Sequence, residues 1–169
     1  MPEQLKDNEI QAILDAGIYA PSASNGQPWH FTVIQSKDLI DRLSDAFKNL
    51  AKKSDMEYVK KVGENEKFHV FYKSPTVILV SGDENNQYAS VDCAAAVENM
   101  LIAAESLGIG SCWVGFIAYL LNSDEGKEFI KELGIPQGFK QIHSVCLGYK
   151  KNKSTNAPSR KINTVNYIK

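Results

Sequence analysis

The side chains best suited to chemistry gather in one stretch, A-P-S-A-S-N-G-Q-P-W-H-F, which covers residues 20–31. Asn25 and Gln27 each provide one acceptor and two donors, and two serine hydroxyls precede them. Pro21 cannot continue a helix, so a helix that reaches this stretch must end here. We therefore expect a tight polar loop between a helix and a strand, which suits a flat heteroaromatic ligand with carbonyl and ring-nitrogen edges. The alternative is an ordinary connector, because turns of this composition are common.

A second stretch with unusual composition is G-I-G-S-C-W-V-G-F, residues 108–116. Its glycines do not follow the spacing G-x-G-x-x-G, and the segment runs from a helix into a strand. A dinucleotide-binding fingerprint needs the opposite order, so a Rossmann fold is excluded. Gly108 is expected to end the preceding helix, whereas Gly115 would let its backbone approach a flat or bulky ligand.

Other catalytic arrangements are missing from the sequence. His30, His69 and His143 show no metal-ligand spacing, so we predict no metal site. No G-x-S-x-G motif occurs, and neither serine of the first stretch has a histidine at a motif spacing. The sequence therefore predicts no side-chain nucleophile.

The composition is that of an ordinary globular protein, with 43% hydrophobic and 23% charged residues. Its 169 residues predict one domain, residues 1–169. The net charge of −1 gives no reason to expect a nucleic-acid or membrane partner. The N-terminus shows no signal-peptide pattern, and the three cysteines lie apart among apolar residues. We expect three buried free thiols and a cytoplasmic location.

The spacing of apolar residues predicts alternating helices and strands. The expected elements are a helix capped by Asp7 or Asn8, a strand over 31–35, a helix capped by Ser36, a surface excursion with a short helix over 52–73, a strand over 75–81, a helix over 91–107, a helix starting at Asn122 or Ser123, a strand over 142–149 and a short apolar segment over 165–168. The strand over 75–81 is β-branched throughout, which is typical of burial on both faces. The 52–73 excursion is either a solvated insertion or a lid over a site.

The helix over 91–107 is apolar around most of its circumference. Its polar residues Asp92, Asn99 and Ser106 recur every seven positions and form a narrow stripe. Such a helix is buried, either in the core of one chain or at the centre of a dimer.

The string A-P-S-x-x-N-x-Q-P-W, followed by an apolar strand, resembles the signature of the FMN-dependent nitroreductase family. The resemblance implies an α+β fold with a central mixed or antiparallel sheet flanked by helices, in an entangled homodimer. It also implies NADH or NADPH as electron donor and ping-pong hydride transfer through FMN to a nitroaromatic, a quinone or a similar small electron-poor acceptor. Alternatives are other flavin chemistry, such as ene reduction or dehalogenation, and a flavin-binding dimer without catalysis.

The resemblance also implies which residues hold the cofactor. In such proteins the flavin carries the chemistry, and the backbone of Val114 and Gly115 would lie beside its N5 atom. The cofactor-binding residues implied are Pro21, Ser22, Ala23, Ser24, Asn25, Gln27, Val114, Gly115, Arg160 and Lys161. The last two follow a proline, and an arginine suits a phosphate because its planar fork donates two parallel hydrogen bonds.

One part of the family pattern is different in this sequence. Relatives carry an Arg-Arg-Ser-x-Arg-like segment ahead of the first helix, where this sequence has Met1 to Lys6. We therefore expect the FMN phosphate to depend on Arg160, Lys161 and lysines of the 52–73 region, or to be bound more weakly.

Overall fold

The computed structural model describes residues 3–152 and 156–169, in which four strands form one sheet. The strands are β1 (Trp29–Ile34), β2 (Thr76–Asp83), β3 (Ile109–Val114) and β4 (Phe139–Tyr149), and their order in the sheet is β1-β2-β4-β3. Every neighbouring pair is antiparallel. Of the two sheet types expected, the antiparallel one is therefore observed.

Strand β2 is buried on both faces, as its β-branched sequence predicted. Val77 and Leu79 belong to one hydrophobic core, and Ile78 and Val80 belong to the other. All four side chains are fully buried. This double burial requires a layer of helices on each side of the sheet.

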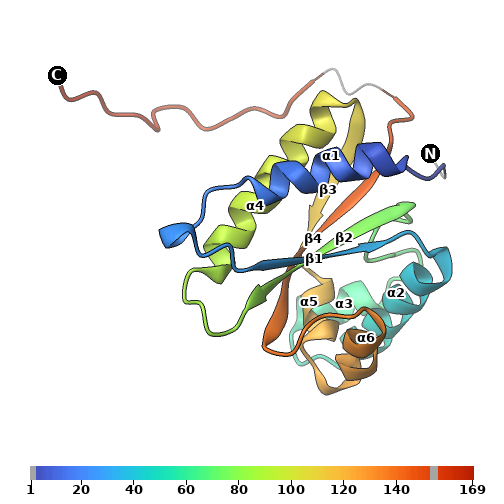
Figure 1. Ribbon diagram of the computed structural model, residues 1–169. Helices are drawn as coiled ribbons and strands as arrows, with labels where there is room; N and C mark the ends of the chain where they lie inside the picture. The colour runs from blue at the N-terminus through green and yellow to red at the C-terminus, as the bar shows by residue number, and fades with distance from the viewer. Residues whose placement is uncertain (1–2, 153–155) are drawn as a thin grey trace.

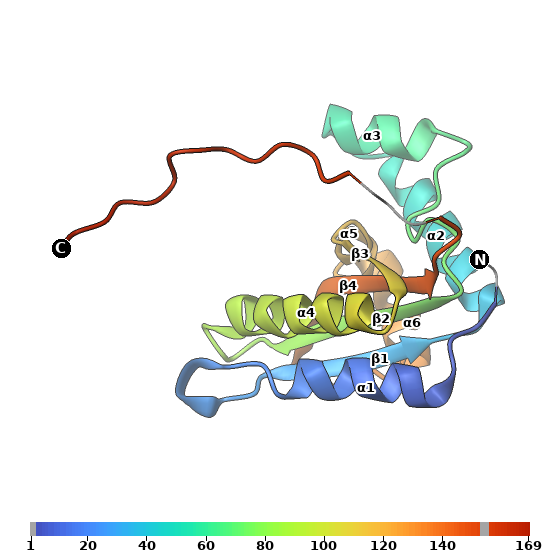
Figure 2. The same cartoon turned by 90° about the horizontal axis from the view of Figure 1, so that it is seen from above.

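The helices form these two layers (Figure 1). Helices α1 (Asp7–Ile18) and α4 (Ala89–Ser106) cover one face and pack side by side (Figure 2). The other side of the sheet carries α2 (Lys37–Ala51), α3 (Glu57–Glu64), α5 (Ile117–Leu121) and α6 (Lys127–Glu132). None of the helices in the described ranges is both long and apolar enough to cross a membrane.

Most helix boundaries follow local chemistry. The Leu39 N–H donates to Ser36 Oγ at 3.3 Å, which confirms the predicted cap of α2. The cap of α1 was predicted one or two residues too late, at Asp7 or Asn8, because Lys6 is the N-cap and its N–H donates to the Glu9 carboxylate at 2.9 Å. Helix α4 starts at Ala89, two residues before the start predicted for the helix over 91–107. Helix α5 was not predicted, since five residues are too few to show a helical period.

The prediction of three buried thiols is wrong for Cys112. Cys93 and Cys146 are buried, and burial raises the pKa of each thiol to about 12. Cys112 is exposed because it borders an open hollow on β3, beside Tyr72 and Ser74, whereas Ile109 and Val114 of the same strand are covered.

The segment 156–169 contains no helix or strand and runs away from the body of the molecule (Figure 1). Its apolar residues Ile162, Val165, Tyr167 and Ile168 are all exposed. The predicted short helix of the 52–73 region is confirmed as α3.

Gly126 packs closely against α5, on the side of the sheet that carries α2, α3, α5 and α6. A Cβ atom on Gly126 would lie 2.2 Å from Leu120 O and 2.7 Å from Leu121 Cα, both backbone atoms of α5. We expect Gly126→Ala to lower the free energy of unfolding by about 1–3 kcal/mol, because the backbone must shift to admit the methyl group. Urea denaturation followed by circular dichroism measures this. Gly115→Ala is the control, since a Cβ there meets no atom within 4 Å; equal stability of the two variants would contradict the packing described.

Candidate functional site

The polar stretch identified in the sequence forms a strained loop, residues 21–27, which we call the motif loop. It connects the end of α1 to the start of β1 and contains one short turn, Ala23–Asn25. Ser24, Asn25 and Gln27 have φ angles of 50°, 55° and 44°, in the left-handed region that non-glycine residues avoid. Each such residue costs of order 1 kcal/mol, so the surrounding structure must hold the loop in this form.

Hydrogen bonds within the loop account for part of that support. The Gln27 N–H donates to Ser22 Oγ at 3.1 Å, and Gln27 Nε2 donates to Asn25 Oδ1 at 3.1 Å. Pro28 is buried at the entrance to β1, and its carbonyl accepts the Asp83 N–H at 2.9 Å. Ser24, Asn25 and Gln27 themselves remain exposed. The loop therefore presents polar groups to the outside in one fixed shape.

Helix α4 provides a further support, which the sequence analysis did not assign. The Ala23 N–H donates to Asp92 Oδ1 at 3.1 Å, and Asp92 is only 5% exposed. Seven residues later, Asn99 Nδ2 donates to the carbonyl of Ala16 in α1 at 3.0 Å. Two of the three residues of the predicted polar stripe, Asp92 and Asn99, thus face the motif loop and α1, whereas Ser106 is exposed and donates to Ala103 O of its own helix. The seven-residue spacing was the available signal, but it does not say which neighbour the stripe meets.

The second predicted stretch ends the edge strand β3. Val114 is 3% exposed, and its carbonyl accepts the Ser144 hydroxyl at 2.7 Å. Gly115 is exposed, and the space beside its Cα is open, because a Cβ atom added there would meet no atom within 4 Å. The backbone at Gly115 is therefore accessible to a flat ligand.

The motif loop and Gly115 lie toward the same end of the sheet, but they are at opposite edges and four residues apart along β4. Trp29 at the start of β1 pairs with Gly82, Gly82 also pairs with Lys140, and Val114 pairs with Ser144 in β4. Two strands separate β1 from β3, so three strand spacings, or roughly 14 Å, lie between the edges. One chain does not bring these two parts of the predicted site together.

Arg160 and Lys161 lie in the exposed C-terminal segment, which runs away from the body of the molecule (Figure 1). Arg160 Nη1 donates to the carbonyl of Pro158 at 2.6 Å. Their guanidinium and ammonium groups are open to an anion, and within the described ranges no hydrogen bond or ion pair joins them to another predicted cofactor residue.

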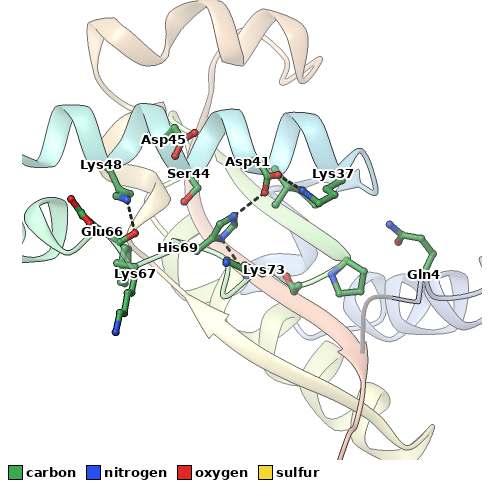
Figure 3. A pocket seen from close by; sticks show the side chains of 14 residues that line it. Gln4, Lys37, Asp41, Ser44, Asp45, Lys48, Glu66, Lys67, His69 and Lys73 are labelled. Atoms are coloured by element: carbon green, nitrogen blue, oxygen red, sulfur yellow. Dashed lines mark hydrogen bonds and ion pairs between the residues drawn. The ribbon is translucent and has the colours of Figure 1, made fainter.

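A cavity of about 580 Å³ lies between α2 and residues 66–75 (Figure 3). His69 Nδ1 accepts the N–H groups of Phe71 and Lys73, each at 3.2 Å, so the ring proton must sit on Nε2, 3.2 Å from Asp41 Oδ1. Asp41 is also paired with Lys37, which lowers the pKa of the Asp41 carboxyl. This network holds the wall of the cavity. Of the lysines in the 52–73 region, Lys67 and Lys73 line it. None of the ten predicted cofactor residues lines the cavity.

Next to the end of β3, the ring of His143 meets the Trp113 indole edge-on, with ring centroids 4.9 Å apart. Burial lowers the pKa of His143, and a backbone contact with Ser90 opposes this shift. His143 Nε2 is buried and finds no hydrogen-bond partner in the described ranges. The folded chain therefore favours the neutral imidazole.

Comparisons of the sequence and of the fold with known proteins point to one protein family. A protein-family model described as Nitroreductase family matches residues 1–149. An Archaeoglobus fulgidus protein, provisionally named NADH dehydrogenase/NAD(P)H nitroreductase, is 34% identical over 156 residues, which cover 89% of this chain and 77% of that protein. The crystal structure of a Bacteroides fragilis nitroreductase with bound FMN superposes with a TM-score of 0.93 at 32% identity, covering 100% of this chain and 91% of that one. A Desulfitobacterium hafniense nitroreductase with bound FMN gives 0.89 at 27% identity, covering 100% and 90%.

The lowered pKa of His143 predicts how the free energy of unfolding depends on pH. Because its pKa is lowered in the folded state, the unfolded chain takes up the proton first as the pH falls below about 6.5, and stability is lost from there downward. We expect the wild type to lose more free energy of unfolding between about pH 7.5 and 5.5 than His143→Gln, which cannot titrate. Urea denaturation at the two pH values measures this difference, and parallel pH profiles would show that His143 is not the group responsible.

Proposed function

The chain belongs to the nitroreductase family, and on this premise we propose that it is an FMN-dependent oxidoreductase. It takes electrons from NADH or NADPH and passes them to small electron-poor acceptors such as nitroaromatics and quinones. The observation that carries the proposal is Gly115, an exposed glycine at the end of an edge strand with open space beside its backbone. A flat isoalloxazine ring fits against such a backbone, and the family match supplies the chemical class.

FMN, when bound, supplies the hydride chemistry, and the residues of this chain bind and orient it. The Val114–Gly115 backbone would lie along the ring, with its amide groups directed toward the flavin. The motif loop, Pro21 to Gln27, would meet the polar edge of the ring with the Asn25 and Gln27 side chains and the serine hydroxyls. Arg160 and Lys161 would bind the phosphate. One site would serve the nicotinamide and then the acceptor, which predicts ping-pong kinetics.

We further propose that the complete site is shared by two copies of the chain. In one copy the motif loop and Gly115 lie at opposite edges of the sheet, and Arg160 lies on a segment that leaves the body. A second copy would bring one loop to the other copy's edge strand. Helix α4 offers a surface for this, since Val91 is 68% and Ile102 is 60% exposed beside the small side chains of Ala94 and Ala95.

The direct test is an anaerobic titration of the purified protein. FMN is added, and the absorbance of the oxidised flavin near roughly 450 nm is followed as NADH or NADPH is added. Rapid bleaching of bound flavin with either nucleotide is the expected result. No binding of FMN would refute the proposal, whereas binding without reduction would favour the flavin-binding protein without catalysis.

Gly115→Ala separates ligand binding from folding. The added methyl group meets no atom of the chain within 4 Å, so the melting temperature should stay unchanged. The same methyl group would occupy the space of the flavin ring, and we expect the Kd for FMN to rise about tenfold or more, equivalent to about 1.4 kcal/mol. Flavin fluorescence titration gives the Kd. An unchanged Kd would place the ring elsewhere.

Arg160→Ala tests the phosphate contact specifically. Riboflavin has the same ring as FMN but no phosphate, so the variant should lose FMN affinity by about tenfold or more and keep its riboflavin affinity. Lys161→Ala should show the same pattern more weakly, because an ammonium group lacks the bidentate geometry. Lys151→Ala, another exposed basic residue, is the control. Equal losses for both flavins would rule out a phosphate contact.

A further inference from the structure

Asp92 is a buried carboxylate in the first turn of α4. Its Oδ1 accepts the Ala23 N–H, but its Oδ2 is buried without a hydrogen-bond partner among residues 3–152 and 156–169. No ion pair involving Asp92 occurs there either. The neighbours of Asp92 on the buried side of α4 are apolar, including Ala89, Cys93 and Ala96.

Such a placement does not favour stability. A buried carboxylate without a cation, and with one oxygen unsatisfied, costs free energy, and an apolar residue of similar size often serves a helix interface as well or better. A buried unsatisfied group in a native structure therefore calls for a reason other than packing. The one partner that Asp92 does have identifies the reason, because Ala23 lies in the motif loop, 69 residues away in the sequence.

The hydrogen bond acts where the loop needs support. Ala23 is the first residue of the short turn, and the strained residues Ser24 and Asn25 follow it directly. Ser22 before it is extended, with φ −140° and ψ 151°, so the chain changes direction at Ala23. An acceptor that holds the Ala23 N–H therefore determines where the three left-handed residues lie relative to α4.

We propose that Asp92 is a positioning residue for flavin binding, which holds Ala23 so that the motif loop keeps the shape that meets the ring. This inference rests on the proposed function. Asp92 does not touch the flavin itself; it acts through the loop backbone. The buried charge and the left-handed residues destabilise the chain without ligand, but they hold the loop in the shape that binds FMN. Binding then requires less ordering of the loop.

Asn99 offers a matched control on the same face of α4. Its hydrogen bond to Ala16 O has nearly the same length as that of Asp92, but it supports helix α1 instead of the motif loop. A general role in packing α4 against α1 predicts similar behaviour of Asp92→Ala and Asn99→Ala. A positioning role predicts that only Asp92→Ala disturbs the flavin.

The test measures the FMN Kd by fluorescence and the urea midpoint for each full-length variant. We expect Asp92→Ala to raise the Kd about 10- to 100-fold, the range for a lost hydrogen bond to a charged group, and Asn99→Ala to change it less than about threefold. Asp92→Asn keeps an acceptor oxygen at the same place and should restore most of the affinity. The visible circular dichroism of bound FMN should change in Asp92→Ala alone, since it reports the asymmetry of the flavin surroundings.

The donor side of the hydrogen bond gives an independent variant. Ala23→Pro removes the N–H without altering α4, and the extended Ser22 is compatible with a following proline. If the two residues act as one unit, the double variant with Asp92→Ala should bind FMN no more weakly than either single variant. If Asp92→Ala fails to fold, Ala23→Pro alone still tests the proposal, because it removes the same hydrogen bond from the donor side and should raise the FMN Kd by a similar factor, and an unchanged Kd would overturn the positioning role.

Each outcome has one meaning. Equal Kd values for Asp92→Ala and wild type, equal losses in Asp92→Ala and Asn99→Ala, or additive losses in the double variant would overturn the positioning role and leave the proposed oxidoreductase standing. Failure of the wild type to bind FMN would instead refute the proposed function, and this inference with it.

Discussion

The rest of the structure depends on the burial of strand β2. Its apolar side chains alternate between two cores, so neither face of the sheet can be left to water. Two helical layers follow from this, and β2 and β4 occupy the centre of the sheet. The strands next to the predicted flavin contacts, β1 and β3, are thereby left at the edges. Edge strands keep open backbone groups, which a ligand or another chain can use.

The same constraint explains why a single chain holds the predicted site in separate parts. The motif loop precedes one edge strand and Gly115 follows the other, with the two buried strands between them. The Arg160 segment leaves the body altogether. The exposed apolar residues of α4 and of the C-terminal segment are consistent with the proposed second copy, which would complete the site and cover these residues.

Helix α4 has a polar face that binds the motif loop and α1, and an exposed apolar face that is free for another chain in the proposed dimer. Its alanines permit close approach, while Asp92 and Asn99 bind the backbone of the motif loop and of α1. Under the proposed dimer, the helix that meets the second copy would also hold the loop offered to that copy's flavin. Placement of the loop and association of the chains would then depend on the same helix.

The sequence by itself determined the family, the position of the polar loop, and the central strand, because proline, the small polar residues and the β-branched run act through local geometry. It also predicted the cap at Ser36 and a strand that begins within residues 108–116. Tertiary structure alone decided three things. It decided that Asp92 is buried against Ala23, because a seven-residue spacing defines a helix face but not its neighbour. It decided that Cys112 is exposed, because the packing of distant segments against β3 sets which of its side chains are covered. It decided that the two halves of the predicted site lie at opposite edges, because that separation follows from pairing between strands far apart in the chain.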